Sequence, residues 1–102
     1  MQATKYQIRF LRIAEEDLIE IISFIAADNT AAARATADKI EKHIELLSFN
    51  PLAGRIPRDE EIKNLGYRYI IVLNYIVFYT IEESTIFIHR ILHGARNYRK
   101  LL

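Results

Sequence analysis

The sequence predicts a single α+β domain over residues 1–102: one N-terminal strand, an antiparallel helical hairpin, then a three-stranded antiparallel meander with a short basic C-terminal tail or helix. Two observations carry this prediction. Apolar residues recur at helical spacing in two segments between residues 14 and 47, separated by a short polar break. Three short apolar runs then follow almost back to back between residues 67 and 92.

The first two elements are a strand and a helix. Tyr6, Ile8 and Phe10 alternate with more polar neighbours, which is typical of a half-buried strand. Acidic residues at Glu15–Asp17 then favour a helix start, because the helix dipole stabilises negative charge in the first turn. A core-facing stripe follows at helical spacing, made of Leu18, Ile21, Ile22 and Ile25.

The second helix is expected from about Ala31 to Leu47, with Asn29 or Thr30 as its cap. Its inner face repeats at the same spacing and consists of Ala33, Ala37, Ile40, Ile44 and Leu47. Because the break between the two helices is so short, they are expected to form an antiparallel hairpin.

Asn50-Pro51 ends this helix, since the residue before a proline avoids the helical region. Residues 50–66 read as a loop with at most one helical turn near Asp59–Leu65. The three expected strands are Tyr67–Leu73, Tyr75–Ile81 and Thr85–Leu92. Asn74 is expected to turn the chain between the first two strands, because asparagine tolerates left-handed backbone angles. Such short connections require antiparallel pairing.

Composition limits the class of protein. The chain has no cysteine, so it has neither disulfides nor a thiolate metal site. It shows no signal peptide and no apolar run of membrane-spanning length, which predicts a cytoplasmic protein with no membrane partner. His89 and His93 alternate onto one face, but two histidines without a carboxylate or thiolate make a poor metal site. We expect no metal and no cofactor.

Charge is unevenly distributed although the net charge is only +1. Residues 1–54 hold eight acidic and six basic residues, whereas residues 55–102 hold five acidic and eight basic residues. No acidic residue follows Glu83, but Arg90, Arg96, Arg99 and Lys100 do. The second half therefore predicts a basic surface for an acidic protein partner or a nucleic acid.

Four arginines are candidates for contacts to an anion. Arg55 and Arg58 flank Pro57 in the loop, and they either bind a carboxylate or phosphate or pair with nearby Asp59 or Glu60. Arg68 and Arg90 lie inside apolar strands. Strict alternation places Arg68 with Ile70 and Val72, and Arg90 with Ile86, Ile88 and Leu92. Each is either a functional cation or a side chain that reaches solvent from the free face.

His93 and Tyr98 form a further candidate site. If the tail folds back over the sheet, they could act as a general acid and base. The alternative is purely structural, with His93 at the strand end and Tyr98 packed on the sheet edge.

Six segments, in order along nearly the whole chain, resemble the RelE/ParE toxins of bacterial toxin–antitoxin pairs: residues 10–18, 25–33, 47–55, 65–69, 74–79 and 89–98. The resemblance implies the fold derived above and a cognate antitoxin that wraps the toxin and folds on binding. It also implies one of two activities. RelE-like members cut mRNA on the ribosome without metal, and ParE-like members poison DNA gyrase.

The matching positions favour the ParE-like branch. Where the RelE-like pattern has an arginine within its Tyr-Arg-Leu-Val-Tyr strand, this chain has Ile76, and Gly94 stands where a further arginine often follows the last strand. Loss of two guanidiniums matters in a metal-free site, since one such electrostatic contact is typically worth about 10²–10³ in rate. The resemblance therefore implies a gyrase inhibitor more than an enzyme.

The partner-contact candidates are Arg55, Arg58, Arg90, Arg96 and Arg99. Two alternatives stay open. One is a ribosome-dependent mRNA endonuclease that uses Arg68, Arg90, His93 and Tyr98, with the ribosome and mRNA as partners. The other is a non-toxic protein that binds the antitoxin and takes part in autoregulation. In every case we expect oligomers to form through the antitoxin.

Overall fold

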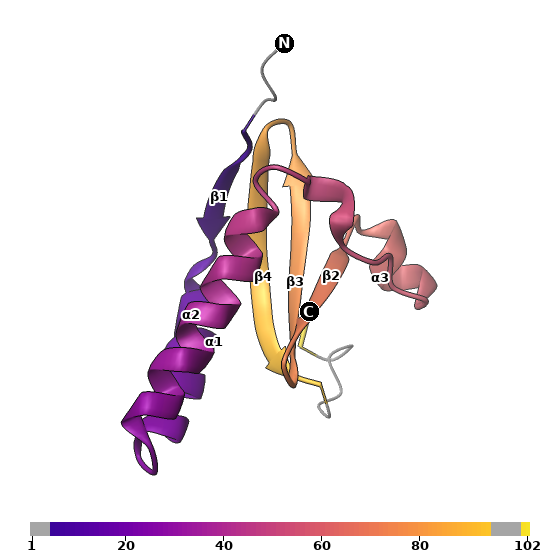
Figure 1. The fold of residues 1–102 in the computed structure, drawn as a ribbon. Helices are drawn as coiled ribbons and strands as arrows, with labels where there is room; N and C mark the ends of the chain where they lie inside the picture. Colours follow the sequence, from indigo (N-terminus) through magenta and orange to yellow (C-terminus); the bar gives the residue numbers. More distant parts are fainter. Residues whose placement is uncertain (1–4, 95–100) are drawn as a thin grey trace.

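The computed structural model describes residues 5–94 and 101–102 and confirms the expected α+β architecture (Figure 1). The order is β1 (Gln7–Phe10), α1 (Arg12–Ala26), α2 (Thr30–Leu46), a 3₁₀ turn (Pro51–Ala53), α3 (Glu60–Asn64), β2 (Arg68–Val72), β3 (Tyr75–Glu82) and β4 (Thr85–His93). Among these described residues, no helix combines the length and apolar character needed to cross a bilayer.

The four strands form one sheet in the order β1-β4-β3-β2, with β1 parallel to β4 and the other pairs antiparallel. The α1–α2 hairpin covers one face of this sheet on the β1 side (Figure 1). The core lies between hairpin and sheet, and its buried members are Ala14, Ile40, Ile44, Leu47, Val72, Val77, Tyr79, Ile86, Ile88 and Ile91. β1 and β2 are consequently the two edge strands.

Two side chains cap helices, and the first of them, Asn29, was one of the two caps that the sequence predicts for the second helix. The Asn29 side chain accepts a hydrogen bond from the Ala32 N–H, which fixes the start of α2. Asp59 caps α3 in the same way by accepting from the Ile62 N–H. The turn between β2 and β3 differs from the prediction, because Leu73 rather than Asn74 has the positive φ, at 56°.

A β-bulge in β4 overturns two predictions about which side chains share a face. Phe78 pairs with Arg90 and Tyr79 pairs with Ile88, so His89 is an extra residue in β4. The bulge reverses the alternation beyond it. Arg90 therefore lies on the face opposite Ile86 and Ile88, and the expectation that they share one face was wrong.

His89 and His93 are also separated by the bulge. His93 pairs in register with Tyr75, which packs against the core under the helices. His89 contacts Thr80 and Tyr67 on the other face. The prediction that the two histidines share a face was therefore wrong.

Candidate functional site

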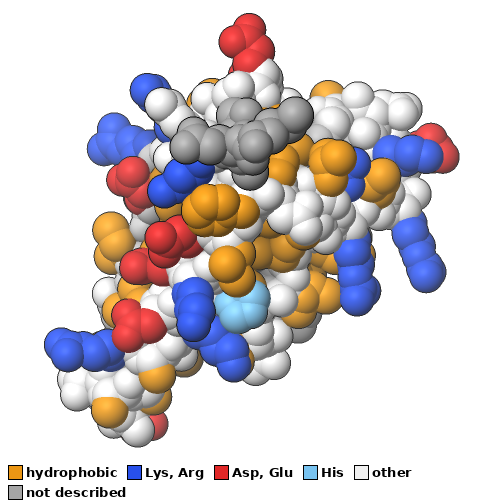
Figure 2. Space-filling model, turned by 45° about the horizontal axis from the view of Figure 1, so that its top comes forward, with side chains coloured by type: hydrophobic (Ala, Val, Ile, Leu, Met, Phe, Trp, Pro, Cys, Tyr) orange, Lys and Arg blue, Asp and Glu red, His pale blue; other side chains and the backbone are white. Residues whose placement is uncertain are grey.

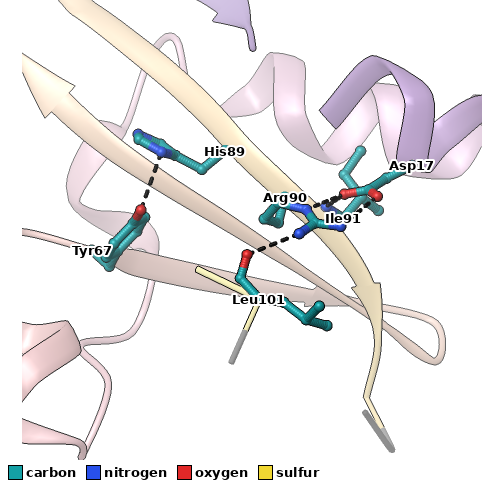
Figure 3. A network of polar contacts seen from close by, with 6 residues as sticks. All are labelled: Asp17, Tyr67, His89, Arg90, Ile91 and Leu101. Atoms are coloured by element: carbon teal, nitrogen blue, oxygen red, sulfur yellow. Dashed lines mark hydrogen bonds and ion pairs between the residues drawn. The ribbon is translucent and has the colours of Figure 1, made fainter. Parts of the chain in front are cut away.

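Arg90 is held inside the molecule by an ion pair with Asp17 of α1. Its Nε and Nη2 atoms each donate to one oxygen of the Asp17 carboxylate at 2.8 Å. Nη1 donates to the carbonyl of Leu101, also at 2.8 Å (Figure 3). The two side chains are only 12% and 11% exposed. The hydrogen bond to Asp17 raises the pKa of Arg90 further above its ordinary value.

The position of Asp17 follows from where β1 stops. The last backbone hydrogen bond between β4 and the chain that follows β1 runs from the Leu11 N–H to the Ile88 carbonyl. Helix α1 then begins at Arg12. Among the described residues, no strand lies beside this edge of β4 beyond Ile88, and Asp17 accepts from the Ile91 N–H at 3.0 Å. One carboxylate therefore balances the charge of Arg90 and accepts one backbone N–H at the open edge of β4. The expectation that Arg90 presents an unpaired guanidinium to a partner is corrected by this geometry.

Arg68 lies elsewhere, at the start of β2. Its Nη1 donates to the Gly54 carbonyl at 3.1 Å. It pairs in register with Tyr79, a core residue under the helices, whereas Arg90 pairs with Phe78. Because neighbouring residues of a strand point to opposite faces, Arg68 and Arg90 lie on opposite faces of the sheet. The structure does not bring these two proposed catalytic arginines together.

His93 is exposed at the end of β4, with its ring 5.8 Å from that of Tyr75 in an edge-to-face arrangement. Tyr75 and Tyr79 are four residues apart on β3, so the Arg68 end of the sheet is about 13 Å from His93 along the strands. Three other candidates, Arg96, Tyr98 and Arg99, lie outside the described residues.

A polar cluster that the sequence reasoning missed surrounds His89. Its Nδ1 lies 3.2 Å from the Tyr67 hydroxyl (Figure 3). Its Nε2 lies 2.8 Å from the Thr80 hydroxyl. Burial lowers the pKa of His89 below its ordinary value of 6.5, and the nearby Glu82 carboxylate opposes this in part. No pattern in the sequence indicates the cluster, because its members are 9 and 22 residues apart along the chain and meet only when the strands pair.

Arg55 and Arg58 remain exposed in the loop before α3. The two ion pairs described within residues 5–94 and 101–102 are Arg12–Glu16 and Arg90–Asp17, and neither of them includes a loop arginine. The backbone of Arg55 exchanges two hydrogen bonds with that of Tyr69 on β2, at 2.8 and 2.9 Å. This bridge fixes the loop against the edge of the sheet. No group of three metal-ligating side chains was found in the described part of the chain.

We compared the sequence of the chain with known protein families. The family described as "ParE toxin of type II toxin-antitoxin system, parDE" matches residues 8–98. The chain belongs to this family. It is thus a toxin of the RelE/ParE superfamily, as the resemblance implied. No curated protein matches the chain.

Two solved structures share the ParE-family fold of this chain. One is a chromosomal ParDE toxin–antitoxin system from P. aeruginosa, with a TM-score of 0.72 and 19% identity over 88% of this chain and 97% of that one. The other is the toxin–antitoxin complex RelBE2 from Mycobacterium tuberculosis, with a TM-score of 0.61 and 27% identity over 87% of this chain and 98% of that one.

The two positions that set this chain apart from the RelE-like pattern are neighbours in space. The Gly94 N–H donates to the Asn74 carbonyl at 2.8 Å, which holds the end of β4 beside the β2–β3 turn. A methyl group on Gly94 would lie 3.9 Å from the Ile76 side chain. At the two positions where the RelE-like pattern has arginines, this chain therefore has an isoleucine and, near it, a glycine without a side chain.

Proposed function

We propose that this protein inhibits growth by poisoning DNA gyrase through protein–protein contact, and that a cognate antitoxin holds it inactive. The observation that carries the proposal is that Ile76 and Gly94, which lie near each other in space, occupy the two positions where the RelE-like pattern has arginines. A metal-free nuclease needs cations there to stabilise the charge that develops on the phosphate.

The arrangement of the remaining cations supports the same proposal. Arg90 is neutralised by Asp17, and Arg68 lies on the other face of the sheet bonded to a backbone carbonyl. Phosphoryl chemistry requires groups that converge within hydrogen-bond reach of one atom. A binding toxin has no such requirement, because its contacts are spread over a surface.

Partner contacts are assigned to the two exposed loop arginines Arg55 and Arg58, which are in neither ion pair of the described residues, and to Arg96 and Arg99 of the tail. Exposed guanidiniums suit an acidic protein surface, since each can bind a carboxylate with two hydrogen bonds. In this proposal Arg90 has a structural role and orients β4 rather than touching the partner.

A supercoiling assay tests the target. The toxin is purified with its antitoxin, separated from it and added to gyrase and relaxed plasmid. Inhibited supercoiling with trapped double-strand cleavage, both reversed by antitoxin, is the expected result. Arg55→Glu/Arg58→Glu should weaken inhibition at least about 10-fold, since each removed contact of this kind is worth roughly 1.5–3 kcal/mol.

Each alternative function predicts a different result when the protein is expressed in cells without its antitoxin. Unaffected gyrase together with codon-phased cuts in translated messages would replace the proposal by a ribosome-dependent mRNA endonuclease. Normal growth after expression without antitoxin would leave only a binding or autoregulatory role.

A further inference from the structure

A cavity beside the open face of the sheet, the face opposite the α1–α2 hairpin, has little charge in its lining. Elsewhere charges are frequent: Figure 2 shows Lys, Arg, Asp and Glu side chains interspersed with exposed hydrophobic ones on one face of the molecule. The cavity, of about 470 Å³, has Glu82 as its charged lining residue. Apolar walls are formed by Leu11, Leu65, Ile81 and Phe87, and polar groups come from Tyr67, Thr80 and His89. Small-molecule sites typically occupy about 300–1,000 Å³.

A hydroxyl and an imidazole meet in this cavity across two neighbouring strands. Tyr79 belongs to the core under the helices, so Thr80, the next residue of β3, points to the open face. Phe87 pairs in register with Thr80, and His89 follows two residues later on β4. The Nε2 atom of His89 lies 2.8 Å from the Thr80 hydroxyl. Its Nδ1 atom lies 3.2 Å from the hydroxyl of Tyr67, just before β2 (Figure 3).

The two distances indicate which atom donates each hydrogen bond. Bonds donated by a hydroxyl are usually about 2.5–3.0 Å long, whereas bonds donated by an N–H group extend to about 3.2 Å. The Thr80 hydroxyl therefore fits as the donor to Nε2, and Nδ1–H fits as the donor to the Tyr67 oxygen. The opposite order would require a hydroxyl donor at 3.2 Å. Tyr67 thus orients the imidazole, and Nε2 is a base for the Thr80 hydroxyl.

Burial keeps both partners of Thr80 in the protonation state that this arrangement needs. It lowers the pKa of His89, so the imidazole is neutral near pH 7 and can accept a proton. The Glu82 carboxylate on β3 opposes this shift in part. Burial also raises the pKa of Tyr67, so its hydroxyl stays protonated.

We propose that Thr80 is the nucleophile, and His89 the base, of an acyl-transfer site that hydrolyses neutral esters of apolar carboxylic acids. The Thr80 oxygen attacks the ester carbonyl carbon while its proton passes to Nε2 of His89. The bond between that carbon and the alcohol oxygen then breaks, and the alcohol leaves with the proton. Water next attacks the acyl-Thr80 carbon and gives a proton to Nε2. The acid is released as the Thr80 oxygen takes that proton back, so the site is restored.

The substrate class follows from the lining of the cavity. Apolar walls accept an aliphatic acyl chain, because its burial removes hydrocarbon from water. Glu82 stands two residues after Thr80 on the same face of β3 and repels an acyl chain with a second negative charge. Among the described lining residues there is no Lys or Arg, so a phosphate or sulfate ester would find no counter-ion. This activity does not depend on the proposed gyrase inhibition.

The reagent para-nitrophenyl hexanoate tests the nucleophile in the full chain. A burst of nitrophenolate equal to the protein concentration is expected, with the hexanoyl group located on Thr80 by peptide mass spectrometry. Thr80→Val keeps the side-chain shape and should abolish the adduct, and His89→Gln should slow its formation at least about 100-fold. Thr85→Val, the matched change at a threonine that does not line the cavity, should have no effect. Circular dichroism confirms that each variant is folded. No adduct, or an adduct on His93 or a lysine instead, would overturn the proposal.

Ring nitrogen chemical shifts test the base without any substrate. At about pH 7.5, His89 should be in the Nδ1–H tautomer. Tyr67→Phe removes the oxygen that accepts from Nδ1–H, so it should shift the ring toward the Nε2–H tautomer and slow acylation at least about 10-fold, with the adduct still on Thr80. An Nε2–H tautomer in the unmodified protein would rule out His89 as the base.

A charged ester tests the substrate class. The mono-para-nitrophenyl ester of adipic acid matches the hexanoate in chain length but carries a carboxylate. At low salt it should acylate Thr80 at least about 3-fold more slowly. Glu82→Gln should remove most of this difference, whereas Glu83→Gln, a neighbouring acid that does not line the cavity, should preserve it. Equal rates for the two esters would contradict the assigned class.

Discussion

Asp17 and Arg90 join the first helix to the last strand through two hydrogen bonds of 2.8 Å, although they stand 73 residues apart in the chain. The same carboxylate accepts a hydrogen bond from the Ile91 N–H, which lies at the edge of β4 beyond the end of β1. This pair converts a residue expected to be a surface cation into a link within the fold. The charge of Arg90 is thereby balanced inside the molecule.

Replacement of Asp17 by asparagine should destabilise the protein by about 3 kcal/mol, because it leaves the nearly buried Arg90 charge without its counter-ion. Urea unfolding followed by circular dichroism measures the change. Glu16→Gln is the matched control, since it breaks only the exposed pair with Arg12 and should cost less than about 0.5 kcal/mol. Equal effects from both variants would show that the Asp17 pair contributes no more than a surface pair.

The contact between Gly54 and Tyr79 predicts non-additive mutations. The Tyr79 hydroxyl accepts from the Gly54 N–H at 2.9 Å and donates to the Pro51 carbonyl at 2.7 Å. A Cβ at residue 54 would overlap the tyrosine, reaching Cε1 at 2.7 Å. Gly54→Ala should therefore cost about 2 kcal/mol through overpacking. Tyr79→Phe should cost about 1–2 kcal/mol through the lost hydrogen bonds.

The double variant Gly54→Ala/Tyr79→Phe should lose somewhat less stability than the sum of the two single variants, because the hydroxyl oxygen, which the added Cβ would approach most closely, is gone, whereas the ring carbons Cε1 and Cζ still lie 2.7 and 2.8 Å from that Cβ. The comparison uses free energies of unfolding from the same urea titrations. Strict additivity would mean that the close approach of Gly54 to the hydroxyl does not limit packing.

His89 predicts a dependence of stability on pH. Its pKa is lowered in the folded protein by burial, so the unfolded chain binds a proton more readily. Stability from this group is complete above the unfolded pKa of about 6.5 and is lost as pH falls toward the lower folded pKa. The urea midpoint should decrease between about pH 7.5 and 5, and His89→Gln should flatten this part of the curve. An unchanged slope in the variant would assign the pH dependence to other groups.

Leu73 predicts a stabilising substitution. Its φ of 56° places a leucine in the left-handed region, where a side chain is strained and asparagine is better tolerated. Leu73→Asn should raise the free energy of unfolding by about 0.5–1 kcal/mol. Leu65→Asn serves as control, because Leu65 is similarly exposed but has an ordinary φ of −79° and should gain nothing. A gain at both positions would trace the effect to lost surface hydrophobicity instead of backbone strain.

Local patterns in the sequence determined the elements and their order. The sequence shows helical spacing from Leu18 to Ile44, a cap at Asn29, and three apolar runs whose short connections require antiparallel pairing. These are properties of neighbouring residues, so they can be read before the fold is known. The sequence alone also shows that Ile76 and Gly94 stand where the RelE-like pattern has arginines. This comparison needs only an alignment of the chain with that pattern.

Only the tertiary structure decided where the charges point. One extra residue at His89 reversed the alternation of β4, separated His89 from His93 and turned Arg90 to the face opposite Ile88. The partner of Arg90 comes from a helix 73 residues away, and Thr80 meets His89 only when β3 and β4 pair. Strand alternation is a rule of period two, so a single inserted residue, invisible in composition or spacing, changes every assignment that follows it.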